Sequence, residues 1–199
     1  AVTVFLLLAG AYRDGRRAWL AEGGAKPAVL AGHSLGEYSA LVASGVLSLS
    51  QAAPLVRFRA QAMQQAVPVG AGAMAAILGM DAAKVIAGCA EAGATFAAGS
   101  GEVVEAVNFN DPMQTVIAGS KAAVEKACEM LKASGAKRAL PLPVSAPFHS
   151  SLMKPAADAL RAKLADVELA APQIPVVNNI DVATPTDPAG IRDALVRQA

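Results

Sequence analysis

The chain has 199 residues, of which 54% are hydrophobic and 17% are charged, and its formal net charge is +1. This composition excludes a disordered chain, and so small a net charge provides no strong field that would attract nucleic acid. The length fits one domain, or one domain with a small insert.

The few cysteines and histidines limit the metal and redox chemistry of the chain. Cys89 and Cys128 are the only cysteines and form no CxxC pair, which indicates two reduced thiols in a cytoplasmic protein. His33 and His149 are the only histidines, so a zinc site would need an unusual set of ligands. We therefore expect no metal and no cofactor.

An apolar run opens the chain at residues 1–10. It is too short to cross a membrane, and its basic residues follow it rather than precede it, so it does not fit a secretion signal. We interpret it as the buried half of a helix that reaches Glu22. Because there is no initiator Met and the last helical pattern, 191–196, has no cap, we expect the chain to be cut at both ends.

The next elements alternate between strand and helix. Residues 28–31 form a short apolar run that predicts a buried strand, and 37–43 predicts a helix. Ser48 and Gln51 match a capping box, which predicts the start of a second helix. Pro54 lies inside that helix, so we expect a kink or a late start there.

Shorter elements follow a change of composition at Pro68. We predict strands at 70–78, 115–118 and 139–144, and helices at 81–92 and 121–134. This alternation indicates a small α+β insert at 68–138, with a ferredoxin-like sheet. Larger elements then return, with a helix at 152–166 and a strand at 176–178. The fold class is therefore α/β, with a discontinuous core at 1–67 and 139–199 that contains a parallel sheet.

The turn at 32–36 carries the sequence Gly-His-Ser-Leu-Gly, which fits the G-x-S-x-G pattern between a strand and a helix. The flanking glycines allow a sharp turn and keep neighbouring backbone clear of the serine. Ser34 would then stand at the N-terminus of the helix, and the backbone N–H of Leu35 would point to the position where an oxyanion forms. The pattern predicts a nucleophilic serine, whereas the alternative is an ordinary turn.

A nucleophilic serine needs a general base, and only two histidines are available. His33 precedes the serine, but a turn of this kind points it elsewhere, so we interpret it as structural. General-base work falls to His149 by elimination. The prolines before His149 predict an extended loop, and the alternative role is that of a surface loop residue.

Arg59 lies in the apolar stripe of the second predicted helix, with Leu55 and Met63 one turn away on either side. Arg57 falls on the opposite face and is expected to be solvated. A buried guanidinium needs an anionic partner. That partner is either a structural carboxylate such as Glu37 or the carboxylate of a substrate, held by two parallel hydrogen bonds.

Together these stretches resemble the malonyl-CoA:acyl carrier protein transacylases and the acyltransferase domains of fatty acid and polyketide synthases, over essentially the whole chain. The matching stretches are Gly32-His33-Ser34-Leu35-Gly36-Glu37-Tyr38, Arg57-Phe58-Arg59-Ala60, Val107-Asn108-Phe109-Asn110, Ala136-Lys137-Arg138-Ala139 and Val144-Ser145-Ala146-Pro147-Phe148-His149-Ser150. The resemblance implies a hydrolase-like core with an inserted ferredoxin-like subdomain.

The resemblance also implies an activity. His149 would take the proton of Ser34, which accepts malonyl from malonyl-CoA and passes it to the phosphopantetheine thiol of acyl carrier protein, for fatty acid or polyketide elongation. Arg59 would hold the malonyl carboxylate, and Phe148 is the residue that accompanies malonyl rather than methylmalonyl units. In this family a backbone carbonyl, not an acid, orients the histidine. We expect a cytoplasmic monomer that binds neither nucleic acid nor membrane.

Two further sets of residues bear on this resemblance. Asn108, Asn110, Lys137 and Arg138 are candidates for contacts with CoA or the acidic carrier protein, although basic residues of this kind usually form a solvated face. The family's N-terminal Gly-Gln-Gly-Ser-Gln stretch, whose glutamine supplies the second oxyanion donor, has no match here, and neither has its C-terminal Gly-Pro-Gly region.

Other functions remain as alternatives. A serine hydrolase of patatin or esterase type has the same turn but no use for Arg59 as a carboxylate clamp. A decayed fragment that only docks carrier protein would not need Ser34, Arg59 and His149 intact. A nucleotide-binding loop at 70–72 is excluded, because no Lys-Ser or Lys-Thr follows it and it opens a strand rather than a helix.

Overall fold

The computed structural model describes residues 27–144 and 146–199, so the predicted helix up to Glu22 lies outside the described residues. Contacts divide the chain into two compact units. The first runs up to Phe58 and resumes at Leu160–Gln198, and the second is Arg59–Ala159. Our limits for the insert, 68–138, rest on composition and stay a prediction.

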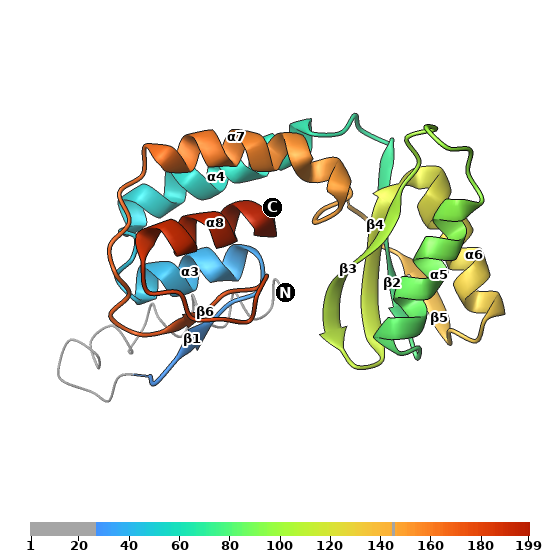
Figure 1. Cartoon of the computed structure of the whole chain (residues 1–199), viewed down its shortest axis with the longest axis horizontal. Helices are drawn as coiled ribbons and strands as arrows, with labels where there is room; N and C mark the ends of the chain where they lie inside the picture. The colour runs from blue at the N-terminus through green and yellow to red at the C-terminus, as the bar shows by residue number, and fades with distance from the viewer. Residues whose placement is uncertain (1–26, 145) are drawn as a thin grey trace. The chain divides into compact units, whose positions relative to one another are not determined.

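The first unit contains a parallel pair of strands, and its described helices lie on one side of this pair (Figure 1). Strand β1 (Leu30–Ala31) pairs with β6 (Val176–Val177), with Leu30 opposite Val176 and Ala31 opposite Val177. Among the described residues, the helices of this unit are α3 (Leu35–Ala43), α8 (Pro188–Gln198), the first part of α4 (Leu49–Gln65) and the second part of α7 (Lys154–Ala165). Large side chains that are almost fully buried form its core: Tyr38, Leu41, Val46, Leu55, Leu160, Leu164 and Leu195.

The capping box at the start of α4 is confirmed. The Gln51 side chain accepts a hydrogen bond from the Ser48 N–H at 2.9 Å, and the Ser48 hydroxyl accepts one from the Gln51 N–H at 3.2 Å. The late start that Pro54 suggested is wrong, because α4 begins at Leu49 and stays helical through Pro54. The missing amide of Pro54 removes only the bond that would reach the Ser50 carbonyl.

The second unit is a ferredoxin-like α+β fold, as predicted. Its elements follow the order β2 (Gly72–Leu78), α5 (Ala82–Ala94), β3 (Val104–Asp111), β4 (Gln114–Ser120), α6 (Lys121–Ala133) and β5 (Arg138–Pro141). The strands form one antiparallel sheet in the order β3-β4-β2-β5, and helices α5 and α6 cover one face of it (Figure 1). A core of Ile77, Val85, Ile117, Val124 and Leu131 lies between sheet and helices.

Strand β3 is the one element of this sheet that our sequence analysis missed. Its pairing with β4 shifts register twice, between Ala106 and Asn108 and again between Phe109 and Asp111. Each shift breaks the alternation of inward and outward side chains that identifies a strand in a sequence. The polar residues of β3 weaken its strand propensity further.

The face of the sheet away from the two helices carries a second apolar cluster. Its buried members are Met74, Ala76, Val116 and Ala118, and Val107, Leu142 and Phe148 pack against them. Phe148 belongs to the loop that follows β5. The sheet therefore supports this loop directly, within the same unit.

Candidate functional site

The turn between β1 and α3 is a strained strand-to-helix elbow. Ser34 has φ 53° and ψ −105°, a combination that side-chain-bearing residues rarely adopt. Gly32 is required here, because a Cβ at this position would lie 2.1 Å from the backbone carbon and oxygen of Gly36. At Gly36 an added Cβ meets nothing within 4 Å among the described residues, so the close approach depends on the first glycine alone.

Of the four backbone amides of residues 34–37, three are hydrogen-bonded. The Ser34 N–H donates to Asn179 Oδ1 at 2.6 Å. The Gly36 N–H donates to the His33 carbonyl at 2.9 Å, and the Glu37 N–H to the Ser34 carbonyl at 3.1 Å. The described residues supply no acceptor for the Leu35 N–H, which lies in the first turn of α3 where amides have no partner within the helix. This amide can therefore receive an oxyanion.

Residues from the far end of the chain surround the elbow within the first unit. Asn179 Nδ2 donates to the Gly32 carbonyl at 2.7 Å, and the Asn179 N–H donates to the Glu37 carboxylate at 3.0 Å. The Gln198 amide donates to the same carboxylate at 2.6 Å. Glu37 and Gln198 are 2% and 5% exposed, so the hydrogen bond between them forms away from solvent, whereas Asn179 itself is exposed. Our sequence analysis named neither Asn179 nor Gln198 as a site residue.

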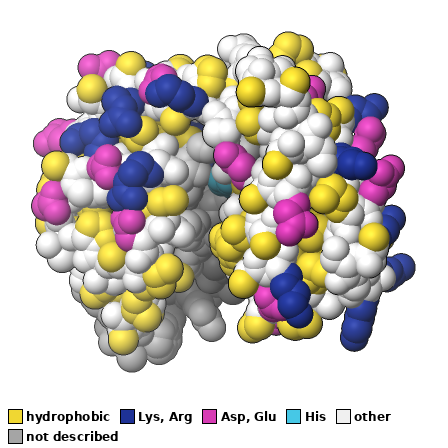
Figure 2. Space-filling model, turned by 45° about the vertical axis from the view of Figure 1, so that its right-hand side comes forward, with side chains coloured by type: hydrophobic (Ala, Val, Ile, Leu, Met, Phe, Trp, Pro, Cys, Tyr) yellow, Lys and Arg dark blue, Asp and Glu magenta, His cyan; other side chains and the backbone are white. Residues whose placement is uncertain are grey.

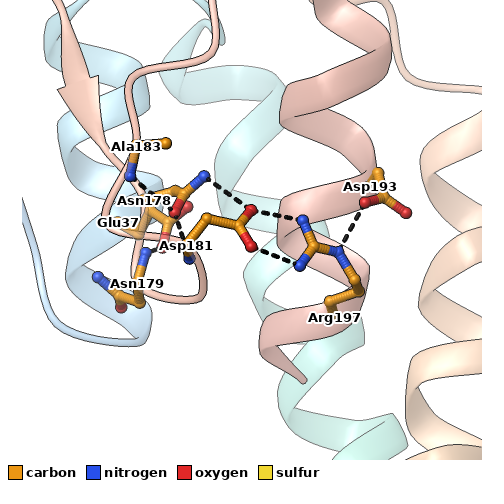
Figure 3. A network of polar contacts seen from close by, with 7 residues as sticks. All are labelled: Glu37, Asn178, Asn179, Asp181, Ala183, Asp193 and Arg197. Carbon is orange, nitrogen blue, oxygen red and sulfur yellow. Dashed lines mark hydrogen bonds and ion pairs between the residues drawn. The ribbon is translucent and has the colours of Figure 1, made fainter.

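A second group of contacts fixes the turn that carries Asn179 (Figure 3). The Asn178 side chain accepts hydrogen bonds from the N–H groups of Asp181 and Ala183. Arg197, on α8, donates two hydrogen bonds to the Asp181 carboxylate and one to Asp193. The hydrogen bonds from Arg197 lower the pKa of Asp181, so this link is present at neutral pH and weakens as the pH falls through that lowered pKa.

His33 lies in the elbow but its side chain is exposed. Partial desolvation lowers the pKa of its imidazole. The structural role that we predict for His33 stays a prediction.

His149 occupies a tight turn in the second unit. The Ser150 N–H donates to the Pro147 carbonyl at 3.4 Å, and the Ser150 hydroxyl donates to the same oxygen at 2.7 Å. His149 itself has φ 65°, again in the left-handed region, and its side chain is half-buried. The extended loop that the prolines predicted therefore includes a turn, and the turn sets the direction of the imidazole.

Packing holds this turn in place. Pro147 lies against β2 so closely that a Cβ on Gly72 would be 2.3 Å from the proline ring. Phe148 packs on the helix-free face of the sheet and also against a cluster that contains Met63 of α4 and Met153. After the turn, Glu105 of β3 accepts a hydrogen bond from the Ser151 N–H at 2.6 Å. This carboxylate caps the short 3₁₀ helix Ser151–Met153, which leads into α7.

Arg59 is buried, as the sequence predicts, with 7% of its surface exposed, and Arg57 is exposed. Leu55 and Met63, four residues to either side of Arg59, are buried with it. Met63 packs in one cluster with Ala146 and Met153, which flank the His149 turn. The second half of α4 and the His149 turn thus belong to one packed region of the second unit.

The candidates for CoA or carrier contacts lie on β3, or at the start of β5 and directly before it, in the second unit. Asn108 is paired with Val116, and Asn110 falls at the second register shift of β3. Lys137 and Arg138 are exposed at the start of β5. On the face shown in Figure 2, basic side chains alternate with acidic ones instead of forming one basic patch, and on α6 three lysines are interleaved with two glutamates.

Other reactive groups are few in the part of the chain that the structure describes. Cys89 is buried, and desolvation raises the pKa of its thiol to about 12. No group of three or more His, Cys, Asp or Glu residues at 27–144 and 146–199 is arranged to hold a metal ion. Over the same residues, no helix combines the length and apolar character that a membrane span requires.

Comparison with known proteins agrees with the fold and the motifs. Residues 10–190 match the acyl transferase domain. The chain therefore belongs to the acyl transferase domain family. It is 57% identical to the malonyl CoA-acyl carrier protein transacylase of Escherichia coli K12 and 56% identical to that of Salmonella typhimurium, each over 92% of this chain and 57% of the relative. The chain thus spans little more than half the length of these relatives.

Solved structures show the same likeness and confirm the α/β fold class. An acyl-carrier-protein S-malonyltransferase from Burkholderia pseudomallei is 67% identical with a TM-score of 0.86, over 92% of this chain and 58% of that one. A malonyl-transacylase in complex with a type II PKS acyl-carrier protein is 52% identical with a TM-score of 0.86, over 92% and 57%.

Proposed function

We propose that the protein transfers a malonyl group from malonyl-CoA to the phosphopantetheine thiol of acyl carrier protein, through a malonyl ester on Ser34. The observation that carries this proposal is the elbow. Ser34 is held in a strained backbone conformation beside one amide, that of Leu35, for which no acceptor is found among the described residues. The names of the similar proteins support the choice of malonyl and acyl carrier protein as substrates.

In the first half-reaction the His149 imidazole accepts the proton of the Ser34 hydroxyl, and the serine oxygen attacks the thioester carbon of malonyl-CoA. The carbonyl oxygen becomes an oxyanion that accepts a hydrogen bond from the Leu35 N–H. When the tetrahedral intermediate collapses, the carbon–sulfur bond breaks, and the CoA sulfur takes the proton from the imidazolium. Malonyl-Ser34 and free CoA result.

The second half-reaction is the same sequence with a different thiol. The phosphopantetheine thiol gives its proton to His149, and the sulfur attacks the ester carbon of malonyl-Ser34. The serine oxygen then leaves and takes the proton back. Arg59, which is buried on α4, would bind the malonyl carboxylate through both half-reactions.

Intact mass spectrometry of the whole protein that carries this chain tests the proposal. After a short incubation with malonyl-CoA we expect the mass of one added malonyl group, located on the peptide that contains Ser34. Ser34→Ala should abolish the adduct, and Ser134→Ala, at the exposed end of α6, should leave it unchanged. Addition of acyl carrier protein should then move the group to the carrier. Release of free malonate instead would indicate a hydrolase, and an adduct elsewhere would exclude Ser34 as the nucleophile.

For the carrier protein and CoA, we propose contacts at Lys137 and Arg138 beside β5, and at Asn108 and Asn110 on β3 at the other edge of the same sheet. Both basic residues are exposed, which supports a role in attracting acidic groups. Lys137→Glu combined with Arg138→Glu should raise the KM for acyl carrier protein and reduce its dependence on salt. The matched control is Lys121→Glu with Lys126→Glu on α6, and an equal effect of both pairs would argue against a specific contact.

We further propose a cytoplasmic monomer that binds neither nucleic acid nor membrane and needs no cofactor. The net charge of +1 and the two free cysteines support this assignment. The mass of the purified protein in solution, measured by light scattering, would test the monomer.

A further inference from the structure

The Asn179 side chain spans the elbow. Its Oδ1 accepts a hydrogen bond from the Ser34 N–H at 2.6 Å, and its Nδ2 donates one to the Gly32 carbonyl at 2.7 Å. Only one orientation of the amide gives the N–H an acceptor and the carbonyl a donor, so the contacts fix which end is oxygen. One carboxamide therefore holds the backbone on both sides of His33.

The position of Asn179 explains this arrangement. Asn179 follows β6, and the parallel pairing of β6 with β1 ends at Val177 opposite Ala31. At this point the chain after β1 turns away into the elbow, and strand pairing can no longer satisfy its backbone groups. The carboxamide takes the place of the next peptide group of the ladder, because it offers the same donor and acceptor.

Buried groups in turn fix the carboxamide. The Asn179 N–H donates to the Glu37 carboxylate at 3.0 Å, and Gln198 Nε2 lies 3.2 Å from Asn179 Oδ1. The same Gln198 amide is 3.3 Å from the Ser34 carbonyl. Glu37 and Gln198 are almost fully buried, so the carboxamide is held in one place.

From this geometry we infer that Asn179 is a positioning residue for the Ser34 nucleophile. It holds the serine in its rare backbone conformation, and by occupying the Ser34 N–H it leaves the Leu35 N–H as the amide that receives the oxyanion. The inference rests on the proposed acyl transfer at Ser34. Asn179 touches no reacting atom and acts only through the elbow.

The experiment compares Asn179→Asp and Asn179→Ala with the unaltered whole protein in single-turnover malonylation. Asp keeps an acceptor for the Ser34 N–H but has no donor for the Gly32 carbonyl, and Ala has neither. We expect the saturating rate of acylation to fall about 10- to 100-fold in each variant, because the strained elbow loses the contacts that position its serine. The malonyl-CoA concentration at half-saturation should stay the same, since no substrate contact is removed.

The matched control is Gln173→Glu, the same change of a carboxamide to a carboxylate at an exposed side chain of the first unit. It should acylate at close to the unaltered rate. A thermal melt identifies any variant that does not fold, and Asn179→Ala decides the question if Asn179→Asp is unfolded. Variants at 179 that fold and acylate as fast as the unaltered protein would overturn the inference, as would an equal loss in the control.

Labelling of Ser34 by a fluorophosphonate separates this inference from the proposed function. The reagent needs the serine and the oxyanion amide but no malonyl or carrier chemistry. If malonyl-CoA fails to acylate the unaltered protein, the proposed function is wrong, and the rate of labelling still decides the role of Asn179. We expect slower labelling in both variants at 179, and an unchanged rate would overturn the inference.

Discussion

The two motif turns share a backbone feature and differ in what holds them. Ser34 and His149 both have positive φ angles, 53° and 65°, which cost residues with side chains about 1–3 kcal/mol. The Ser34 elbow is held by two hydrogen bonds with the Asn179 side chain, which accepts one and donates the other. The His149 turn packs through Pro147 and Phe148 on the ferredoxin-like sheet, and the hydrogen bonds from Ser150 to the Pro147 carbonyl lie within the turn itself.

The two kinds of contact suit what each turn must position. Hydrogen bonds fix the position of individual atoms, whereas apolar packing tolerates exchanges that conserve volume. An elbow that presents one serine oxygen and one backbone amide needs hydrogen bonds, because the position of each atom matters. Apolar packing is enough for a turn that presents an imidazole, because the imidazole can move slightly to reach its proton. The two turns should therefore respond differently to substitution.

The largest effect is expected from His149→Ala. General-base catalysis contributes about 10²–10⁴-fold, so single-turnover acylation should slow by that factor. The thermal melt should change little, because Pro147 and Phe148, which carry the packing of the turn, remain. His33→Ala is the control and should cost far less. Equal losses in the two variants would mean that the base is wrongly assigned.

Arg59→Ala tests the packed region that the His149 turn shares with α4. Loss of one partner of a buried charge pair costs about 2–5 kcal/mol, or roughly thirty-fold to several thousand-fold in kcat/KM for malonyl-CoA. Transfer from acetyl-CoA should not fall, because acetyl has no carboxylate. Arg57→Ala should change little, and Arg59→Lys should restore only part of the activity, since an ammonium lacks the planar fork.

Both kcat/KM values, measured beside a thermal melt, separate this role from a structural one. A purely structural Arg59 would impair both substrates alike and lower the melting temperature. If the ratio of malonyl to acetyl transfer is unchanged, Arg59 is not the carboxylate clamp.

Gly32→Ala should damage the elbow specifically. Its new Cβ would lie 2.1 Å from the Gly36 backbone, so the elbow must shift, and a misplacement of about 1 Å in an active site can cost on the order of 10²-fold in rate. Gly36→Ala meets no obstacle among the described residues and should be tolerated. The rate of single-turnover acylation should be measured for both variants. A Gly32→Ala variant that acylates at the unaltered rate would show that the elbow is not held as tightly as we describe.

The smallest effect is expected from Glu105→Ala, which removes the one polar contact described here between β3 and the segment after the His149 turn. Loss of a helix cap costs about 0.5–2 kcal/mol, and chemical denaturation should detect it. Glu125→Ala, on an exposed part of α6, is the matched control. Acylation should slow only slightly, because packing still holds the turn. A loss of activity as large as that of Gly32→Ala would contradict the distinction between the two turns.

Much of the fold could be predicted because its signals are local. The capping box of α4 needs only Ser48 and Gln51, and the alternation of strands and helices after Pro68 was enough to indicate a ferredoxin-like sheet. Strand β3 was missed because two register shifts disrupt its pattern. The length of α4 through Pro54 depends on surrounding contacts, which a single window of sequence does not contain.

The candidate site residues also differ in whether a local sequence pattern reveals them. Ser34 stands in a local pattern, and the burial of Arg59 follows from helix periodicity. Asn179 has no such pattern, because its partners lie far away in the sequence. A signal did exist: two asparagines directly follow the strand at 176–177, and the carboxyl ends of parallel strands meet at one edge of the sheet. That rule would have placed them near the end of the strand that leads to Ser34.

The distance along the chain between Ser34 and Asn179 has a consequence for biosynthesis. The two residues are 145 positions apart, and a ribosome that adds about 5–20 residues per second needs roughly 7–30 s to make the intervening chain. During that interval the entire Arg59–Ala159 unit is made. Its antiparallel sheet can assemble while the strained serine still lacks the carboxamide that holds it. The residue that holds the nucleophile is therefore made after the Arg59–Ala159 unit has had time to fold.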